Sequence, residues 1–239
     1  MMHPRLTMRL RAVLASALLV SLELLAIDHP AATLASCNPG RAPHDRTARY
    51  VVTMGNISSL TGVTADILEY DPYYTAYNAT GTNASEMLVK YSPTQWAQLG
   101  WLKSKLWNGT VQRSVFLEFH LSSSQNYYQF MSAEPLGTST WYEILFSSPS
   151  TFYFYVNGTH WFTETGSIPP TQYQFFGETH DWEDQMPGGY NAHDTFTSTD
   201  YFQSGVPYSV TTAIQYGWPF GGSHPSTARY DVWDAICPS

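Results

Sequence analysis

Two polar residues, each in the middle of a strand-like run, are the candidates for chemistry in this sequence. Gln98 lies in the segment Trp96–Trp101, and Glu178 lies in the segment Phe176–His180. If a β-sheet brings these side chains together, the glutamate can act as a general base toward a bound water molecule. The glutamine amide can orient that water and donate a hydrogen bond to an oxyanion. The pair therefore predicts a hydrolase with Gln98 and Glu178 as its catalytic residues.

The elements that must position this pair are β-strands. After the N-terminal region, apolar and polar residues alternate with period two, and turn residues interrupt the alternation about every ten positions. This pattern predicts an all-β protein, an antiparallel β-sandwich of the jelly-roll, concanavalin-like type, with no substantial helix. The strongest turn signal is Asn157-Gly158, because both residues accept the positive φ of a two-residue hairpin turn. Strands are predicted, among other places, over residues 85–91, 95–102, 113–121 and 172–179.

The alternation also predicts which side chains face away from the core. In residues 115–121 the odd-numbered positions are apolar, so Glu118 faces the other way. In residues 172–178 the odd-numbered positions suit a core, so Gln174 and Glu178 face the opposite side. A curved sheet with a polar and aromatic outer face is the binding cleft that a jelly roll offers.

Short motifs along residues 95–203 resemble those of the neprosin family. Gly177-Glu178-Thr179 and the later turn Asp184–Gly189 look like that family's C-terminal motif. Gln98–Trp101 is similar to its first catalytic segment, with glutamine here in place of glutamate. A glutamine and glutamate pair on a β-sandwich is also the arrangement of the eqolisin glutamic peptidases. The resemblance implies an endopeptidase that is active at acid pH, uses this pair and needs no cofactor.

Further residues are expected to contact a substrate, which the resemblance implies is a polypeptide. These expected substrate-binding residues are Trp96, Trp101, Glu118, Gln174 and Trp182. Two other functions stay open. Exposed tryptophans could stack on sugars, in which case the protein is a non-catalytic binding module for polysaccharide or cell-wall material. Alternatively, Glu118 and Glu178 could form the carboxyl pair of a glycosidase.

One stretch, residues 180–205, interrupts the strand pattern. It is predicted to be a long connection, of a length that often forms a lid or a binding loop. Its acidic residues, with His180 and His193, could bind calcium. Their spacing matches no calcium-binding loop motif, which favours a solvated charged loop instead. No metal site and no cofactor are therefore predicted.

The N-terminal residues predict export. Arginines precede an apolar run over residues 12–27, and small residues up to Ala35 suit cleavage by signal peptidase. Residues 1–35 are therefore a predicted signal peptide, and residues 36–239 a single β-sandwich domain. The apolar run is too short for a membrane span. The expected localisation is secreted and extracellular.

The two cysteines, Cys37 and Cys237, leave two alternatives. They could form a disulfide, because exported proteins meet an oxidising environment. Alternatively, Cys37 follows Leu34-Ala35-Ser36 and could carry a lipid anchor. The formal charge of −8 at pH 7 disfavours nucleic acid and anionic lipid as partners. The expected partners are a polypeptide substrate or an extracellular polymer, and no oligomeric state is indicated.

Overall fold

Two β-sheets account for the regular structure of the part of the chain that the structure describes. The computed structural model describes residues 37–41, 49–75, 82–105, 109–122, 125–147, 150–166 and 169–238. These residues include no helix, and hence none that could span a membrane. The predicted signal peptide, residues 1–35, lies outside the described residues.

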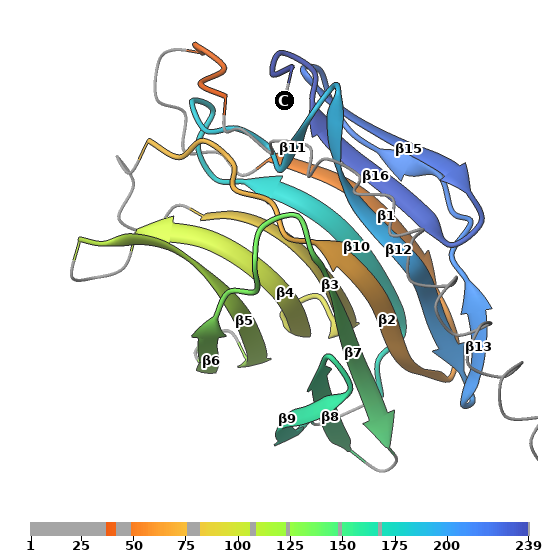
Figure 1. Ribbon diagram of the computed structural model, residues 1–239. Helices are drawn as coiled ribbons and strands as arrows, with labels where there is room; N and C mark the ends of the chain where they lie inside the picture. Colours follow the sequence, from red (N-terminus) through yellow and green to blue (C-terminus); the bar gives the residue numbers. More distant parts are fainter. Residues whose placement is uncertain are drawn as a thin grey trace, which may run out of the picture. The chain divides into compact units, whose positions relative to one another are not determined.

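The first sheet has seven strands in the order β14-β1-β10-β3-β4-β5-β6. Their bounds are β1 (Arg49–Asn56), β3 (Thr82–Ser92), β4 (Gln95–Lys105), β5 (Val111–Ser122), β6 (Gln125–Ser132), β10 (Gln172–Thr179) and β14 (Ile214–Gln215). All pairings in this sheet are antiparallel. Figure 1 shows β10, β3, β4 and β5 as long, curved arrows. Gln98 lies on β4 and Glu178 lies on β10.

The second sheet has nine strands in the order β15-β16-β11-β12-β2-β7-β8-β9, with β13 paired to β12. Their bounds are β2 (Leu60–Leu68), β7 (Ser139–Ser147), β8 (Thr151–Val156), β9 (Thr159–Thr165), β11 (Gly188–Gly189), β12 (Ala192–Gln203), β13 (Val206–Ser209), β15 (Phe220–Ser226) and β16 (Arg229–Asp234). The predicted hairpin turn at Asn157-Gly158 joins β8 to β9, with φ angles of 50° and 73°. All strand pairings in the second sheet are antiparallel except that of β11 with β16, which is parallel.

The apolar core lies between the two sheets. Leu99, Leu117 and Phe175 are fully buried residues of the first sheet, and Ile67 and Ile144 are their counterparts in the second. Across the interface, β4 contacts β7, and β2 contacts both β3 and β10. The fold is therefore the antiparallel β-sandwich of jelly-roll type that the alternation predicts. Its first sheet keeps an outer face that the core does not cover.

The prediction of a long connection over residues 180–205 is wrong, because this stretch contains β11 and the 12-residue strand β12. Strand β12 is hard to recognise in the sequence because one of its buried positions is occupied by an aspartate. Asp194 on β12 is fully buried and accepts a hydrogen bond from the Ser85 hydroxyl. Burial raises the pKa of Asp194 well above its usual value. This segment is part of the sandwich and not a lid.

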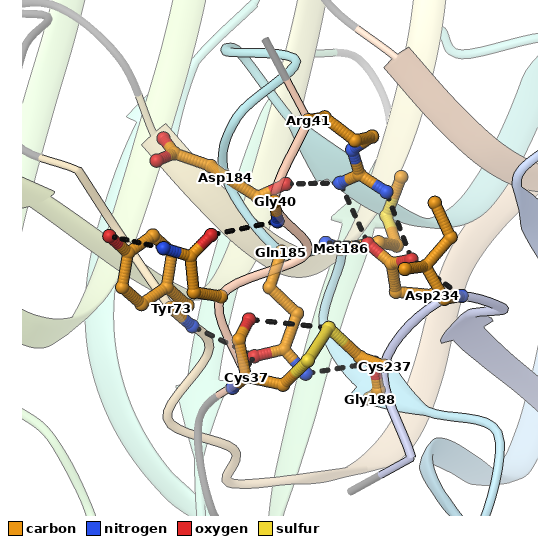
Figure 2. Close-up of a disulfide and its surroundings, with 12 residues drawn as sticks. Cys37, Gly40, Arg41, Tyr73, Asp184, Gln185, Met186, Gly188, Asp234 and Cys237 are labelled. Carbon is orange, nitrogen blue, oxygen red and sulfur yellow. Dashed lines mark hydrogen bonds and ion pairs between the residues drawn. A yellow bond between two sulfur atoms is a disulfide. The ribbon is translucent and has the colours of Figure 1, made fainter.

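A disulfide joins Cys37 to Cys237, which are 200 residues apart in the sequence. The Cys37 thiol is therefore bonded to sulfur and is not free to carry a lipid. Figure 2 shows the segment Cys37–Arg41 beside Asp234 at the end of β16. Two nitrogens of the Arg41 guanidinium contact the two carboxylate oxygens of Asp234, at 2.9 and 2.7 Å. The disulfide is consistent with an extracellular protein.

Candidate active site

A groove of about 620 Å³ opens on the outer face of the first sheet. Its lining includes the predicted site residues Trp96, Gln98, Glu118, Gln174 and Glu178. Phe116, Phe130 and Phe176 add an apolar surface. The volume lies in the range of small-molecule sites in proteins. The sheet thus brings Gln98 and Glu178 to one face.

Two of the expected substrate-binding tryptophans lie elsewhere. Trp101 is 0% exposed, and its indole N–H donates to the Leu68 carbonyl oxygen in the core at 2.9 Å. Trp182 lies beside the N-terminal segment, with the Arg41 guanidinium carbon 5.0 Å from its ring centre. Neither tryptophan lines the groove. Trp96 and Trp101 are separated by an odd number of positions, so a strand directs them to opposite faces.

The Gln98 side chain is held by a glutamate on the neighbouring strand. Gln98 and Glu118 are cross-strand partners on β4 and β5. The amide N–H of Gln98 donates to Glu118 Oε2 at 2.6 Å, and the Tyr128 hydroxyl donates to Oε1 at 2.9 Å. Burial raises the pKa of Glu118, although the hydrogen bond from Tyr128 opposes the shift. These contacts fix the orientation of the Gln98 amide at the groove.

Glu178 is held by a second set of contacts at the end of β10. His180 Nε2 lies 3.2 Å from Glu178 Oε1, and the Thr82 hydroxyl donates to the same oxygen at 3.3 Å. Burial disfavours the charged form of His180, but the hydrogen bond and charge of Glu178 outweigh it and raise the His180 pKa. A protonated His180 can donate a charged hydrogen bond to the Glu178 carboxylate, which holds that carboxylate in place at the groove.

The strand register sets the separation of Gln98 and Glu178. Strand β3 lies between β4 and β10. Gln98 pairs with Leu88 on β3, and Leu88 pairs with Gln174 on β10, so Glu178 lies four residues beyond the row of Gln98. Two strand spacings amount to about 10 Å and four residues to about 13 Å. The two backbone positions therefore lie at the ends of a diagonal across the groove.

Glu86 occupies the middle of that diagonal. It lies on β3 opposite Gly100 on β4 and Phe176 on β10, and it is 0% exposed. Neither of its carboxyl oxygens accepts a hydrogen bond from a donor among the described residues. Its contact is instead with the carboxyl group of Glu178. Burial, followed by the charges of Glu178 and Glu118, raises the pKa of Glu86 well above its usual value.

Reasoning from the sequence missed Glu86, which stands in a largely apolar run. The alternation does carry a signal, because Met87 and Val89 face the core and Glu86 and Lys90 must face the other side. The alternation along one strand cannot supply the cross-strand register that places Glu86 beside Glu178.

Gly100 leaves the space that Glu86 needs. A Cβ atom at position 100 would lie 2.6 Å from Glu86 Cα and 2.7 Å from Glu86 Cβ, and would overlap the Ser85 carbonyl oxygen. We expect Gly100→Ala to lower the free energy of unfolding by about 1–3 kcal/mol, because the β3 backbone cannot move aside without disturbing the sheet. Chemical denaturation measures this change.

Gly217 provides the matched control for that substitution. A Cβ atom at position 217 would meet no atom within 4 Å. We expect Gly217→Ala to change the free energy of unfolding by less than about 0.5 kcal/mol. Equal denaturation midpoints for the two variants would contradict the close approach of β3 and β4.

The acidic residues after β10 have structural partners. Asp184 accepts hydrogen bonds from the Thr75 backbone N–H at 2.6 Å and from the Thr75 hydroxyl at 2.9 Å. Asp181 accepts one from the Glu183 backbone N–H at 3.1 Å. Both aspartates are buried, so they do not form the solvated loop that their spacing favours. Within the described ranges, no group of three or more His, Cys, Asp or Glu residues could hold a metal ion.

The comparisons with known proteins identify structural relatives. No protein-family model and no curated protein matches the chain. The chain is similar in structure to Scytalido-glutamic peptidase with a peptide-based transition state analogue, with a TM-score of 0.56 and 11% identity over 81% of this chain and 100% of that chain. It is also similar to SCP-B, a member of the eqolisin family of peptidases in a complex with the tripeptide Ala-Ile-His, with a TM-score of 0.54 and 10% identity over the same shares, 81% and 100%. At these identities the likeness shows a shared fold.

Proposed function

We propose that the protein is a secreted glutamic-type endopeptidase that hydrolyses peptide bonds at acidic pH, with Gln98 and Glu178 as its catalytic residues. The observation that carries this proposal is one groove lined by both side chains, each held by its neighbours. The fold shared with two glutamic peptidases and the motif resemblance support the same function. The proposed substrate is an extended polypeptide, and the reaction needs no cofactor.

The proposed reaction uses the Glu178 carboxylate as its general base. Glu178 takes a proton from a water molecule while the water oxygen bonds to the carbonyl carbon of the substrate. The Gln98 amide has two N–H groups, and the one that is not bonded to Glu118 donates a hydrogen bond to the oxyanion of the tetrahedral intermediate. Protonated Glu178 then gives its proton to the amide nitrogen as the C–N bond breaks. A carboxylic acid and an amine leave, and Glu178 is again ionised.

An acid optimum follows from the charges at the site. Glu86, Glu118 and Glu178 interact with one another, and burial raises the pKa of the first two. As the pH rises, more of these carboxyl groups ionise and repel each other. His180, whose pKa the hydrogen bond and charge of Glu178 raise, also loses its proton as the pH rises further. We therefore expect activity to decline toward alkaline pH.

Cleavage of an unfolded protein or a peptide library from about pH 2 to pH 7 tests the proposed function. We expect cleavage that resists inhibitors directed at serine, cysteine and metallopeptidases, because the reaction uses only Glu178 and Gln98. A folded, disulfide-bonded protein that cleaves no peptide at any pH would contradict the proposal.

The contribution of Gln98 is open to a direct measurement. We expect Gln98→Ala to lower kcat by about 10²–10³-fold, because the amide acts on charge that develops in the transition state. Gln203→Ala is the matched control, since Gln203 lies on β12 in the second sheet and donates to the Ser58 carbonyl oxygen. Equal kcat values for the two variants would remove Gln98 from the mechanism.

A binding module for polysaccharide is the second candidate function, and exposed aromatic residues at the groove favour it. Tyr50, Tyr128 and Phe130 line the groove and are 47%, 49% and 49% exposed. Solvent-exposed ring faces can stack on sugars. Calorimetric titration with cell-wall oligosaccharides that shows binding, together with no cleavage of any peptide, would select this function.

The glycosidase alternative requires Glu118 and Glu178 to act as a pair. Strands β5 and β10 are separated by β4 and β3. Three strand spacings amount to about 14 Å, and Glu178 also lies four residues, about 13 Å, beyond the row that Glu118 shares with Gln98, so the two backbone positions are about 19 Å apart. Both side chains would have to lean inward to reach the roughly 5–9.5 Å between the carboxyl groups of glycosidases. Release of reducing sugar from a polysaccharide would favour this alternative.

A further inference from the structure

We infer that Glu86 and Glu178 form a carboxyl pair that shares one proton, in which Glu86 is the protonated positioning residue and Glu178 is the ionised member at the groove. The shared proton is a property of the folded protein. Its consequence for catalysis rests on the proposed function.

The contact between the two side chains follows from the register. Glu178 pairs with Ala84 on β3, so Glu86 is its diagonal neighbour on the same face of the sheet. The carboxyl groups touch, and no described residue donates a hydrogen bond to either oxygen of Glu86. Two ionised carboxylates in contact repel each other strongly. One proton removes this repulsion and converts one partner into a hydrogen-bond donor.

The surroundings assign the proton to Glu86. Glu178 has compensating contacts with His180 and Thr82, at 3.2 and 3.3 Å, and it lines the groove. Glu86 is 0% exposed and has no such contact with a cation or a hydroxyl among the described residues. A buried charge without a partner is costly, so the neutral form is favoured at Glu86.

The other charged or titratable groups around the pair do not replace this proton. Tyr50 on β1 faces both carboxyl groups, and burial, followed by the charges of Glu178 and Glu86, raises its pKa to about 12. Glu118 on β5 adds a third carboxyl group that disfavours ionisation of Glu86. Lys90 also lines the groove, but it lies on β3 opposite Trp96, four residues along the strand from Glu86.

The pair gives this groove a second carboxyl group next to the proposed base, although position 98 carries a glutamine. A protonated Glu86 donates a hydrogen bond to Glu178, which fixes the orientation of the Glu178 carboxylate. Loss of the proton from Glu86 at higher pH would remove that donor and place two negative charges in contact. The pair therefore loses its catalytic geometry as the pH rises.

The shared proton can be tested without any substrate, by comparing the thermal stability of the wild type and Glu86→Gln across pH. The ordinary pKa of the glutamate side chain is 4.5, and the folded protein raises that of Glu86 well above this value. The folded wild type therefore loses stability as the pH rises above about 4.5, where the unfolded chain ionises Glu86 readily. Glu86→Gln cannot ionise, so its melting temperature should rise relative to the wild type between about pH 4 and pH 8. A difference that stays constant over this range would overturn the inference.

Glu143→Gln is the matched control for this comparison. Glu143 lies on β7 in the second sheet, and burial alone raises its pKa. We expect a smaller pH-dependent difference for this variant than for Glu86→Gln. If Glu86→Gln does not fold, a carbon-13 NMR titration of the wild-type glutamate carboxyl groups replaces it. The signal assigned to Glu86 must then stay protonated well above the ordinary glutamate value of 4.5, and an assigned Glu86 signal that titrates at that value would overturn the inference.

The positioning role is tested by the pH dependence of cleavage. We expect Glu86→Gln to keep a large part of kcat at the optimum, because its amide N–H still donates to Glu178, and to shift the alkaline limb of kcat upward by about one pH unit or more. A limb set by His180 alone would stay in place in Glu86→Gln and move in His180→Gln, which would overturn the role of Glu86. If the wild type cleaves no peptide while the stability comparison succeeds, the proposed function fails and the shared proton stands.

Discussion

Replacing Glu178 by glutamine is expected to lower kcat for peptide cleavage by about 10³–10⁴-fold, which is the largest effect of any single substitution at the groove. A glutamine has nearly the same shape but cannot take a proton from water or return one to the leaving nitrogen. Steady-state kinetics at the pH optimum measure this loss. The melting temperature and the disulfide should show that the variant is folded.

The experiment must show that the substitution lowers kcat and not the affinity for the peptide. Peptide binding should be almost unchanged, because Phe116, Phe130 and Phe176 still line the groove. Glu143→Gln, on β7 of the second sheet, is the control and should cleave like the wild type. Cleavage by Glu178→Gln at the rate of that control would remove Glu178 from the chemistry and leave a binding groove.

The sequence predicted the orientation of Glu178 correctly because β10 follows a simple rule. The strand was expected over residues 172–179 and is observed over Gln172–Thr179. Tyr173 and Phe175 face the core, and Gln174 and Glu178 line the groove. In a strand with one buried face, the alternation of apolar and polar residues is enough to show which side chains face the core. The same rule would have excluded Trp101 from the groove.

Where positions in the interior are crowded or polar, the same rule fails. Residues 220–226 contain two glycines and a proline, which are residues typical of turns, and yet they form β15. A Cβ at Gly221 would overlap the Trp233 ring, and one at Gly222 would lie 2.7 Å from Val51 and from Ile214. The glycines are needed for close packing. Only the partner strands reveal this, as they do for buried Asp194 on β12.

The motif resemblance combined residues with different roles. Glu178 lines the groove, whereas Gln185 in the Asp184–Gly189 turn is fully buried. Gln185 Oε1 accepts hydrogen bonds from the backbone N–H groups of Cys37 and Tyr73, each at 2.9 Å, as Figure 2 shows. This turn therefore anchors the N-terminal segment. A linear motif cannot separate a structural glutamine from a catalytic one, because the distinction depends on contacts with distant residues.

Removal of the disulfide is expected to cause the largest loss of stability. The bond closes a loop with a sequence separation of 200 residues. In the chain-entropy model, such a loop stabilises the folded state by about 5 kcal/mol. The double variant Cys37→Ser with Cys237→Ser should therefore melt about 10–20 °C below the wild type. Differential scanning calorimetry measures the change, and reduced wild-type protein should give the same result.

The non-covalent contacts of the N-terminal segment should keep the reduced protein active at low temperature. Arg41 is buried against Asp234, and it also donates to the backbone carbonyl oxygens of Trp182 and Asp184, both at 2.6 Å. None of these residues lines the groove. Cleavage at 25 °C should therefore survive in the double variant. An unchanged melting temperature would show that these contacts alone hold the ends of the domain.

Arg41→Met with an intact disulfide measures the contribution of these contacts to the free energy of unfolding. The substitution leaves the buried Asp234 carboxylate without its cation, at a cost of about 3–5 kcal/mol.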